Sequence, residues 1–340
     1  MRRFAELYTM RNACIFVLLI GFSLGAFAQN PVKKIPKAKL PFVERNTYIN
    51  PKSGFVRGTQ SFPRGRDTVL ACLIIPGSGP TDRNGNNGNI LQSNAYKMLS
   101  DSLAARGYAV IRYDKRGLGD SREPNFSEAG LRFDDYVRDA SRWIKDMKAN
   151  KRFSKVVVIG HSEGSLIGML AADSSGADAF ISLAGPAKSA DTLILDQLKN
   201  QQLSLYEEAQ RITAKLRAGK QVDTLSPMLT AVYRPSVQPY LKSWFAYRPA
   251  TEIAKVKVPV LIVQGTTDIQ VPVAEAESLK KAKPEAEYLL IQGMNHVLKT
   301  APADRALNIA TYYNENLPLH PELIPGLVSF LRRIEALPKK

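Results

Sequence analysis

The feature that most constrains this chain is a short apolar run followed at once by two glycines that bracket a serine. Residues 156–159 read Val-Val-Val-Ile, and residues 160–164 read Gly-His-Ser-Glu-Gly. Branched apolar residues in so short a run are typical of a strand buried in a parallel sheet, and residues 165–172 follow as a helical stretch. Glycines on both sides allow a close approach of strand and helix around a strained serine. The pattern predicts a Ser162 hydroxyl that projects above a sheet, with a helix N-terminus behind it. A plain strand-to-helix turn would show the same five residues, so a base and an acid must be found elsewhere.

Similar apolar runs alternate with helical patterns along most of the chain. Strand-like runs occur at residues 69–75, 108–114, 179–186, 258–265 and 288–293. Helical spacing of apolar residues is found from Leu91 to Leu103, over residues 134–149 and 273–282, and in the C-terminal segment with Ile324, Leu327, Leu331 and Ile334. This alternation predicts an α/β fold with a mostly parallel central sheet flanked by helices.

The N-terminal segment has the pattern of an export signal. Three arginines among the first eleven residues precede an uncharged apolar run at residues 13–27, and Ala-Phe-Ala follows at residues 26–28. The run is short for a membrane span and the final tripeptide matches a cleavage site. We expect a signal peptide over 1–28 that is cut near Ala28, so that the mature protein is exported, either periplasmic or secreted. An uncleaved N-terminal anchor is the alternative.

Composition changes divide the rest of the chain. Residues 29–66 are expected to form a basic leader and N-terminal edge strands, and residues 67–340 the main domain. Within that domain the alternation stops at about 187–250, where a long helical pattern that ends near Gly219 is followed by several aromatic residues. We expect this insertion to be a helical cap over the site. Its aromatic side chains could line an acyl pocket or hold the cap to the body.

The candidate base follows from elimination among the three histidines. His161 adjoins Ser162 in the turn, so its side chain must point away from the serine hydroxyl. His320 lies in a proline-bounded connector, whereas His296 follows the last predicted strand. Sites in parallel sheets form outside the carboxyl ends of strands, which favours His296 over His320.

The candidate acid is Asp268, which follows the strand at residues 258–265. In this position it lies between serine and histidine in chain order, and it could accept a hydrogen bond from the ring of His296. A turn aspartate that bonds its own backbone would look the same. Asp191 and Asp196 are alternative acids.

Charge and cysteine content exclude several classes of protein. The formal net charge is +16, but the basic residues are spread along the chain without zinc-finger spacing or interleaved aromatics. We expect a basic surface, which could associate weakly with anionic surfaces. Nucleic acid is not an expected partner. Cys72 would be the only cysteine left after signal removal, so no internal disulfide is expected.

Asp82, Asn84 and Asn86 imitate a calcium loop, but the required glycine and glutamate are absent. No metal or organic cofactor is expected.

Five motifs together resemble those of the α/β-hydrolase superfamily of serine hydrolases. They read GHSEG, GTTD, GMNH, PGSGPTDRNGN and RYDKRGLGDS, and the likeness covers residues 65–340. Among members, the chain looks like secreted bacterial esterases and serine-aminopeptidase-like or thioesterase-like hydrolases. The resemblance implies an oxyanion hole formed by the backbone N–H groups of Ser78 and Glu163. Pro76 stands where many members have histidine, which leaves the second donor open.

The expected reaction is hydrolysis of a carboxylic ester through an acyl-enzyme on Ser162, with a Ser-His-Asp triad completed by His296 and Asp268. The partner would be a small-molecule acyl substrate. Thioesters and N-terminal peptide bonds remain open, and Glu207 and Glu208 are candidates for binding a substrate amine. A catalytically inactive binding protein with the same fold is the alternative of another class. The oligomeric state stays open.

Overall fold

The computed structural model describes residues 40–50, 54–88, 91–199 and 203–338. The predicted signal peptide at residues 1–28, and the leader as far as residue 39, lie outside the described residues. Within the described ranges no helix is both long and apolar enough to span a membrane.

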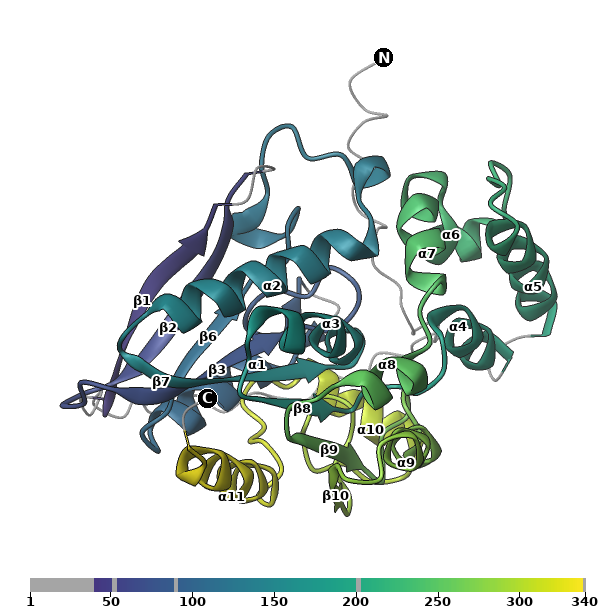
Figure 1. The fold of residues 1–340 in the computed structure, drawn as a ribbon. Coiled ribbons are helices and arrows are strands. Elements are labelled where there is room, and N and C mark those ends of the chain that lie inside the picture. Colours follow the sequence, from purple (N-terminus) through teal and green to yellow (C-terminus); the bar gives the residue numbers. More distant parts are fainter. Residues whose placement is uncertain (1–39, 51–53, 89–90, 200–202, 339–340) are drawn as a thin grey trace, which may run out of the picture.

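An eight-stranded sheet forms the centre of the molecule (Figure 1). Its strands stand in the order β1-β2-β6-β3-β7-β8-β9-β10, and all neighbours are parallel except β1 with β2 and β2 with β6. The strands are β1 (Phe42–Ile49), β2 (Val56–Pro63), β3 (Val69–Ile75), β6 (Ala109–Tyr113), β7 (Phe153–His161), β8 (Ala179–Leu183), β9 (Val260–Gly265) and β10 (Glu287–Ile291). A small hairpin of β4 (Asn86–Asn87) and β5 (Leu91–Gln92) stands apart from this sheet. The predicted α/β architecture with a mostly parallel sheet is confirmed.

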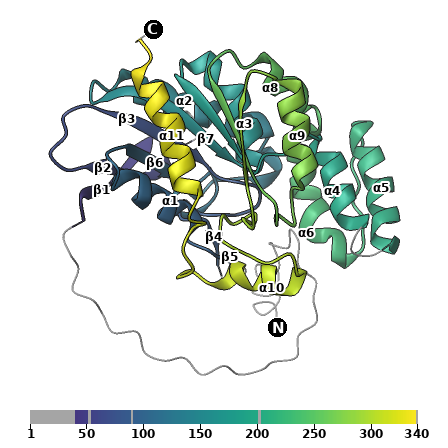
Figure 2. The same cartoon turned by 90° about the horizontal axis from the view of Figure 1, so that it is seen from below.

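Helices cover both faces of the sheet, which explains why its central strands are apolar throughout. Every residue of β3 is buried, and successive residues contribute alternately to two separate cores. Leu73 packs in the core under α2, α3 and α9, and Cys72 in the core under α1 and α11. Figure 2 shows α11 and α1 together on one side of the strands. The covering helices are α1 (Ala95–Ala104), α2 (Phe133–Ala149), α3 (Glu163–Ala172), α9 (Val273–Ala282) and α11 (Leu323–Ala336).

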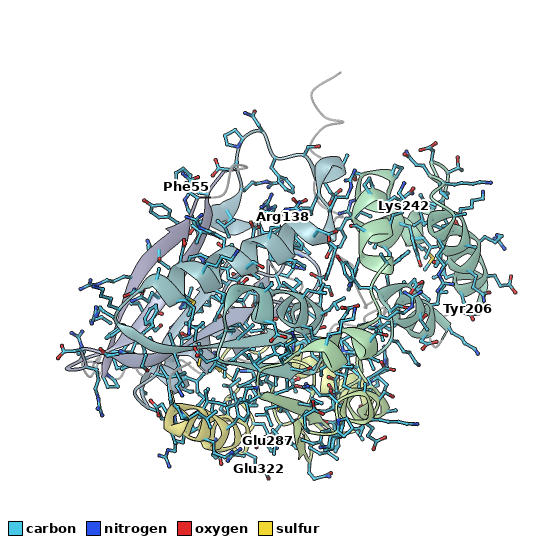
Figure 3. The ribbon with its side chains drawn as sticks, viewed as in Figure 1. Phe55, Arg138, Tyr206, Lys242, Glu287 and Glu322 are labelled. Atoms are coloured by element: carbon cyan, nitrogen blue, oxygen red, sulfur yellow. The ribbon has the colours of Figure 1, made fainter. Side chains whose placement is uncertain are left out.

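A group of helices between β8 and β9 forms the segment where a cap was expected. In Figure 3, Tyr206 and Lys242 on these helices lie at the opposite end of the view from Phe55. The helices are α4 (Ala190–Lys199), α5 (Leu203–Arg217), α6 (Thr230–Tyr233), α7 (Gln238–Phe245) and α8 (Pro249–Lys255). The ring of Trp244 stacks on Phe133 at the start of α2, with ring centroids 5.8 Å apart. Cap aromatics therefore attach the cap to the body, one of the two roles left open by the sequence.

The structure corrects two expectations about helices. The helix predicted from Leu91 begins only at Ala95, because Asn94 has a left-handed backbone (φ 50°) and its side chain is paired with that of Asn86. The long helical pattern in the cap belongs to two helices, α4 and α5. An apolar period continues across the start of α1, whereas the turn at Asn94 depends on a side chain eight residues away.

Short elements complete the chain. The 3-10 helices are η1 (Gly119–Ser121), η2 (Glu128–Gly130), η3 (Asp173–Ser175), η4 (Pro227–Leu229), η5 (Pro235–Val237) and η6 (Thr311–Tyr313), and α10 (Arg305–Ala310) precedes the last of these. In space, η6 at the end of this segment lies beside β5. In the chain, the segment follows the loop that carries His296.

Candidate active site

Ser162 occupies the tip of the turn between β7 and α3. Its backbone has φ 55° and ψ −121°, a region that side-chain-bearing residues rarely adopt. The neighbouring glycines are sterically required: a Cβ on Gly160 would lie 2.2 Å from the carbonyl oxygen of Gly164, and a Cβ on Gly164 would lie 2.3 Å from that of Ile75. The Ser162 amide is held by the carbonyl of Leu183 at 3.0 Å. The structure thus has a partly exposed serine on a strained, tightly packed turn.

Asp268 and His296 are brought together from the loops that follow β9 and β10. The distance between His296 Nδ1 and Asp268 Oδ2 is 2.7 Å, and the two side chains are 6% and 1% exposed. A carboxylate can only accept this bond, so the ring carries a proton on Nδ1 and leaves Nε2 as an acceptor when neutral. The other oxygen of Asp268 accepts the amides of Gln270 and Val271 at 2.8 and 2.9 Å. These bonds orient the carboxylate toward the ring.

The loop of His296 lies directly against the serine turn. The ring of His161, next in the chain to Ser162, is bonded to the backbone carbonyl of His296 at 2.9 Å. The centroids of the two imidazole rings are 4.7 Å apart. His296 therefore lies beside the serine turn and is also bonded to Asp268.

The alternative base and acids have other partners. His320 accepts the amide of Glu322 through its ring at 3.3 Å. Asp191 pairs with Arg217 and Asp196 with Lys188, in both cases within or at the start of the cap. None of these contacts joins a histidine to an acid, whereas His296 and Asp268 share one.

The loop after β3 lies over the serine turn from the other side. A Cβ on Gly77 would lie 3.2 Å from the Cβ of Ser162, so the two backbones are in near contact. The Gly77 amide donates to the hydroxyl of Tyr96 at 2.9 Å, and its carbonyl accepts the amine of Lys115 at 2.7 Å. Ser78 follows with a partly exposed side chain. The expected oxyanion loop is therefore held next to Ser162 by its own hydrogen bonds.

A buried ion pair lies under this arrangement. Lys115 Nζ is 3.1 Å from Glu163 Oε1, and both side chains are 2% exposed. The same amine lies 4.8 Å from the ring centroid of Tyr136. Because Lys115 also holds the Gly77 carbonyl, it connects the first residue of α3 to the expected oxyanion loop.

Neither Lys115 nor Tyr96 can be singled out in the sequence pattern. Lys115 stands among residues typical of a turn, and Tyr96 is one apolar position of a helix. Lys115 lies within the motif RYDKRGLGDS, but that resemblance gave the lysine no role. Its role appears only when β6 is placed beside β3.

The two glutamates proposed as ligands of a substrate amine lie elsewhere. Glu207 is exposed on α5, and the carboxylate of Glu208 accepts the amide of Ser226 at 2.7 Å. Figure 1 shows α5 at the outer end of the cap. The carboxylate beside the serine turn, that of Glu163, is already paired.

The loops that imitated a calcium site have structural contacts. The Oδ1 atom of Asp82 accepts the amides of Asn84 and Asn86 at 2.8 and 2.9 Å. Asp114 accepts the amide of Arg83 at 2.7 Å and the amide of Asp120 at 3.0 Å. Among the described residues no three or more His, Cys, Asp or Glu side chains are arranged so that they could hold a metal ion. Asp114 thus joins the loop of Arg83 to the loop of Asp120.

Known proteins resemble the chain in sequence and in fold. A family model described as "Serine aminopeptidase, S33" matches residues 86–239, a stretch that contains Ser162. The curated protein "Esterase EstD" of Thermotoga maritima is 26% identical over 264 residues, which are 76% of this chain and 60% of that protein. The chain therefore spans about three fifths of the length of this relative.

Solved structures show the same fold at low identity. Est1E from Butyrivibrio proteoclasticus, with ferulic acid bound, superposes with a TM-score of 0.58 at 19% identity, over 86% of this chain and 100% of that one. A thermophilic esterase from Thermogutta terrifontis gives 0.52 at 14% identity, over 85% and 99%. The sheet order, the strained serine turn and these similarities together show that the chain has the α/β-hydrolase fold.

Proposed function

We propose that this protein is a serine hydrolase that cleaves carboxylic esters through an acyl-enzyme on Ser162. The observation that carries the proposal is the 2.7 Å bond between His296 and Asp268, in a loop that lies against the strained serine turn. A nucleophile on a strained turn, a base beside it and an oriented acid are the parts that acyl transfer requires.

The proton arrangement suits this reaction. With Nδ1 bonded to Asp268, His296 presents Nε2 to take the proton of Ser162 as its oxygen attacks the acyl carbonyl. Asp268 stabilises the imidazolium that forms. His296 then returns the proton to the leaving alcohol, and water repeats the cycle on the acyl-enzyme.

The tetrahedral oxyanion would be held by the backbone N–H groups of Glu163 and Ser78. Glu163 opens α3, so its amide points from the positive end of a helix. The packing of Gly77 against Ser162 supports Ser78 as the second donor. Loss of one such donor typically costs about 3 kcal/mol in the barrier.

Ester cleavage is favoured over capture of a peptide N-terminus. The relative from Thermotoga maritima and the structural neighbour from Thermogutta terrifontis are both described as esterases. The acid beside the turn, Glu163, is neutralised by Lys115 and is therefore a poor ligand for a substrate amine. Peptide and thioester cleavage remain second candidates because the matched family model describes a serine aminopeptidase.

The first test is hydrolysis of p-nitrophenyl esters from acetate to long acyl chains. We expect Ser162→Ala to lower kcat/KM by about 10⁴ or more, and Asp268→Asn by about 10³–10⁴ because the wrong tautomer of His296 is favoured. Ser174→Ala is the control, since Ser174 is an exposed serine beyond the end of α3 and should leave turnover unchanged. The chain-length optimum would report the acyl pocket.

Labelling by a fluorophosphonate separates the alternatives. Labelling of Ser162 without ester turnover would direct the search to peptides or thioesters. Absence of both turnover and labelling would reject the enzyme and favour a binding protein. The proposed export is checked separately by sequencing the mature N-terminus, which should be Gln29; an intact Met1 would reject cleavage.

A further inference from the structure

A continuous chain of hydrogen bonds runs behind the serine turn, from the oxyanion loop to the loop of the base. The Gly77 amide donates to Tyr96 Oη at 2.9 Å, and Tyr96 Oη is 2.7 Å from Nδ1 of His161. The other ring nitrogen of His161, Nε2, is 2.9 Å from the carbonyl oxygen of His296. Three segments that are far apart in the sequence are thereby joined to the residue that precedes Ser162.

The two ends of this chain determine the position of every proton in it. The Gly77 amide can only donate and the His296 carbonyl can only accept. His161 must therefore carry its proton on Nε2 and accept at Nδ1, and Tyr96 must donate its hydroxyl proton to that nitrogen. A second proton on His161 would leave two donors facing each other or turn the tyrosine proton away from its acceptor.

Burial supports the same protonation state. Tyr96 and His161 are 3% and 6% exposed. Desolvation and the neighbouring His296 lower the pKa of His161 to about 3, so the ring is neutral throughout the working range of a hydrolase. A buried, neutral ring with both nitrogens occupied has no free site for a substrate or a transferable proton.

The two ends of this hydrogen-bond chain, Gly77 and His296, lie in the parts of the site that must be placed most accurately. At one end, the bond to Tyr96 sets the orientation of the Gly77 peptide and with it the entry of the chain into Ser78. At the other end, the bond from His161 holds the backbone that carries the base. Errors of about 1 Å in such placements can cost about 10²-fold in rate.

We propose that Tyr96 and His161 are positioning residues that hold the oxyanion loop and the loop of His296 at a common distance from Ser162. This rests on the proposed hydrolase function. Neither residue contacts the reacting atoms; they act through Gly77 and His296. These hydrogen bonds should stabilise the transition state and contribute little to substrate binding. Their loss should therefore lower kcat.

The test compares Tyr96→Phe with Tyr288→Phe. Both substitutions delete one buried hydroxyl, but that of Tyr288 has no partner among the described residues and lies on β10 near its amino end. For Tyr96→Phe we expect kcat to fall about 10- to 100-fold with KM within threefold of the original. Tyr288→Phe should match the unmodified protein.

A trifluoromethyl ketone provides a readout that general loosening of the structure would not reproduce. Such a ketone adds to the serine and places a negative oxygen in the oxyanion hole. Its Ki should rise in Tyr96→Phe by the same factor by which kcat/KM falls. Unchanged kcat, or a loss confined to KM, would overturn the proposal.

The proton arrangement is tested in the unmodified protein, so the outcome does not depend on the folding of a variant. With only three histidines, ¹⁵N-histidine NMR can resolve each ring. We expect one ring to be neutral with its proton on Nε2 from pH 5 to 9, and another, that of His296, to carry its proton on Nδ1. A His161 ring that titrates in this range, or that is protonated on Nδ1, would contradict the inference. An unmodified protein that neither turns over esters nor binds the ketone would instead reject the proposed function.

Discussion

Lys115 and Glu163 form an ion pair where almost no water can reach either charge. Moving two charges out of water is costly, so such a pair seldom adds much to the free energy of folding. In this protein its geometry gives it a different use, because the amine also binds the carbonyl of Gly77 at 2.7 Å. One cation thus joins the Gly77 loop, the proposed oxyanion loop, to the first residue of α3, and Tyr96 and His161 connect the same loop to the loop of His296.

The lowered pKa of His161 makes the stability of the fold depend on pH. Unfolded, this ring has a pKa of about 6.5; folded, burial lowers it to about 3. Between these values the unfolded chain binds a proton that the folded chain does not. The contribution of the neutral ring to the free energy of unfolding is therefore fully present above about pH 6.5. It decreases as the pH falls and is about 2 kcal/mol smaller at pH 5.

Urea unfolding from pH 7 to pH 5 measures this effect. The slope of the unfolding free energy against pH should be steeper in the unmodified protein than in His161→Gln, whose side chain does not titrate. Other groups titrate equally in both proteins, so they cancel in the comparison. Equal slopes would show that the ring has an ordinary pKa.

At the scale of elements, the contact between β3, β7 and α3 leaves no room for a side chain at two positions. A methyl group on Gly164 would lie 2.3 Å from the carbonyl oxygen of Ile75, and neither backbone can move without disturbing the sheet. We expect Gly164→Ala to destabilise the protein by about 3 kcal/mol or more. Thermal unfolding measures this, with Gly130→Ala as control, because a Cβ there would meet nothing nearer than 3.8 Å. Equal melting temperatures for the two variants would mean that the turn is less tightly packed than described.

At the scale of the whole molecule, the cap is attached to the body by a few polar contacts beside its aromatic stack. Glu128 accepts a hydrogen bond from Arg234 Nε at 2.9 Å and also contacts Ser236. The hydroxyl of Ser243 accepts the amide of Phe133 at 2.8 Å. The contacts lie at η2 and at the start of α2, so they fix one end of the cap.

Breaking the Glu128 contact should loosen this end of the cap alone. We expect Glu128→Ala to speed hydrogen exchange of the amides in η5 and α7 about tenfold, with the central strands unchanged. Asp146→Asn is the control, because its pair with Arg142 is exposed on α2. Faster exchange throughout the sheet would mean instead that the cap and the body unfold as one unit.

Much of the fold and of the candidate site follows from local chemistry. The apolar runs at residues 69–75 and 258–265 predict buried strands because the branched side chains of such strands pack on both faces, and both strands are present. The positions of Asp268 and His296 after their strands could be predicted, since the carboxyl ends of parallel strands meet at one edge of a sheet. The predicted start of α1 at Leu91 was wrong, because the left-handed turn at Asn94 depends on the pairing of Asn94 with Asn86.

The α/β class and the glycine-bracketed serine turn can be read from the sequence alone, because each depends on residues that are neighbours in the chain. The tertiary structure was needed to show that the favoured histidine, His296, contacts Asp268. It was also needed to show that Lys115, Tyr96 and His161 join the loops around Ser162. The Tyr96 and His161 side chains are 65 positions apart, and His161 and His296 are 135 apart. No local pattern encodes such contacts; they arise when strand order brings the carboxyl ends of β3, β7 and β10 to one edge.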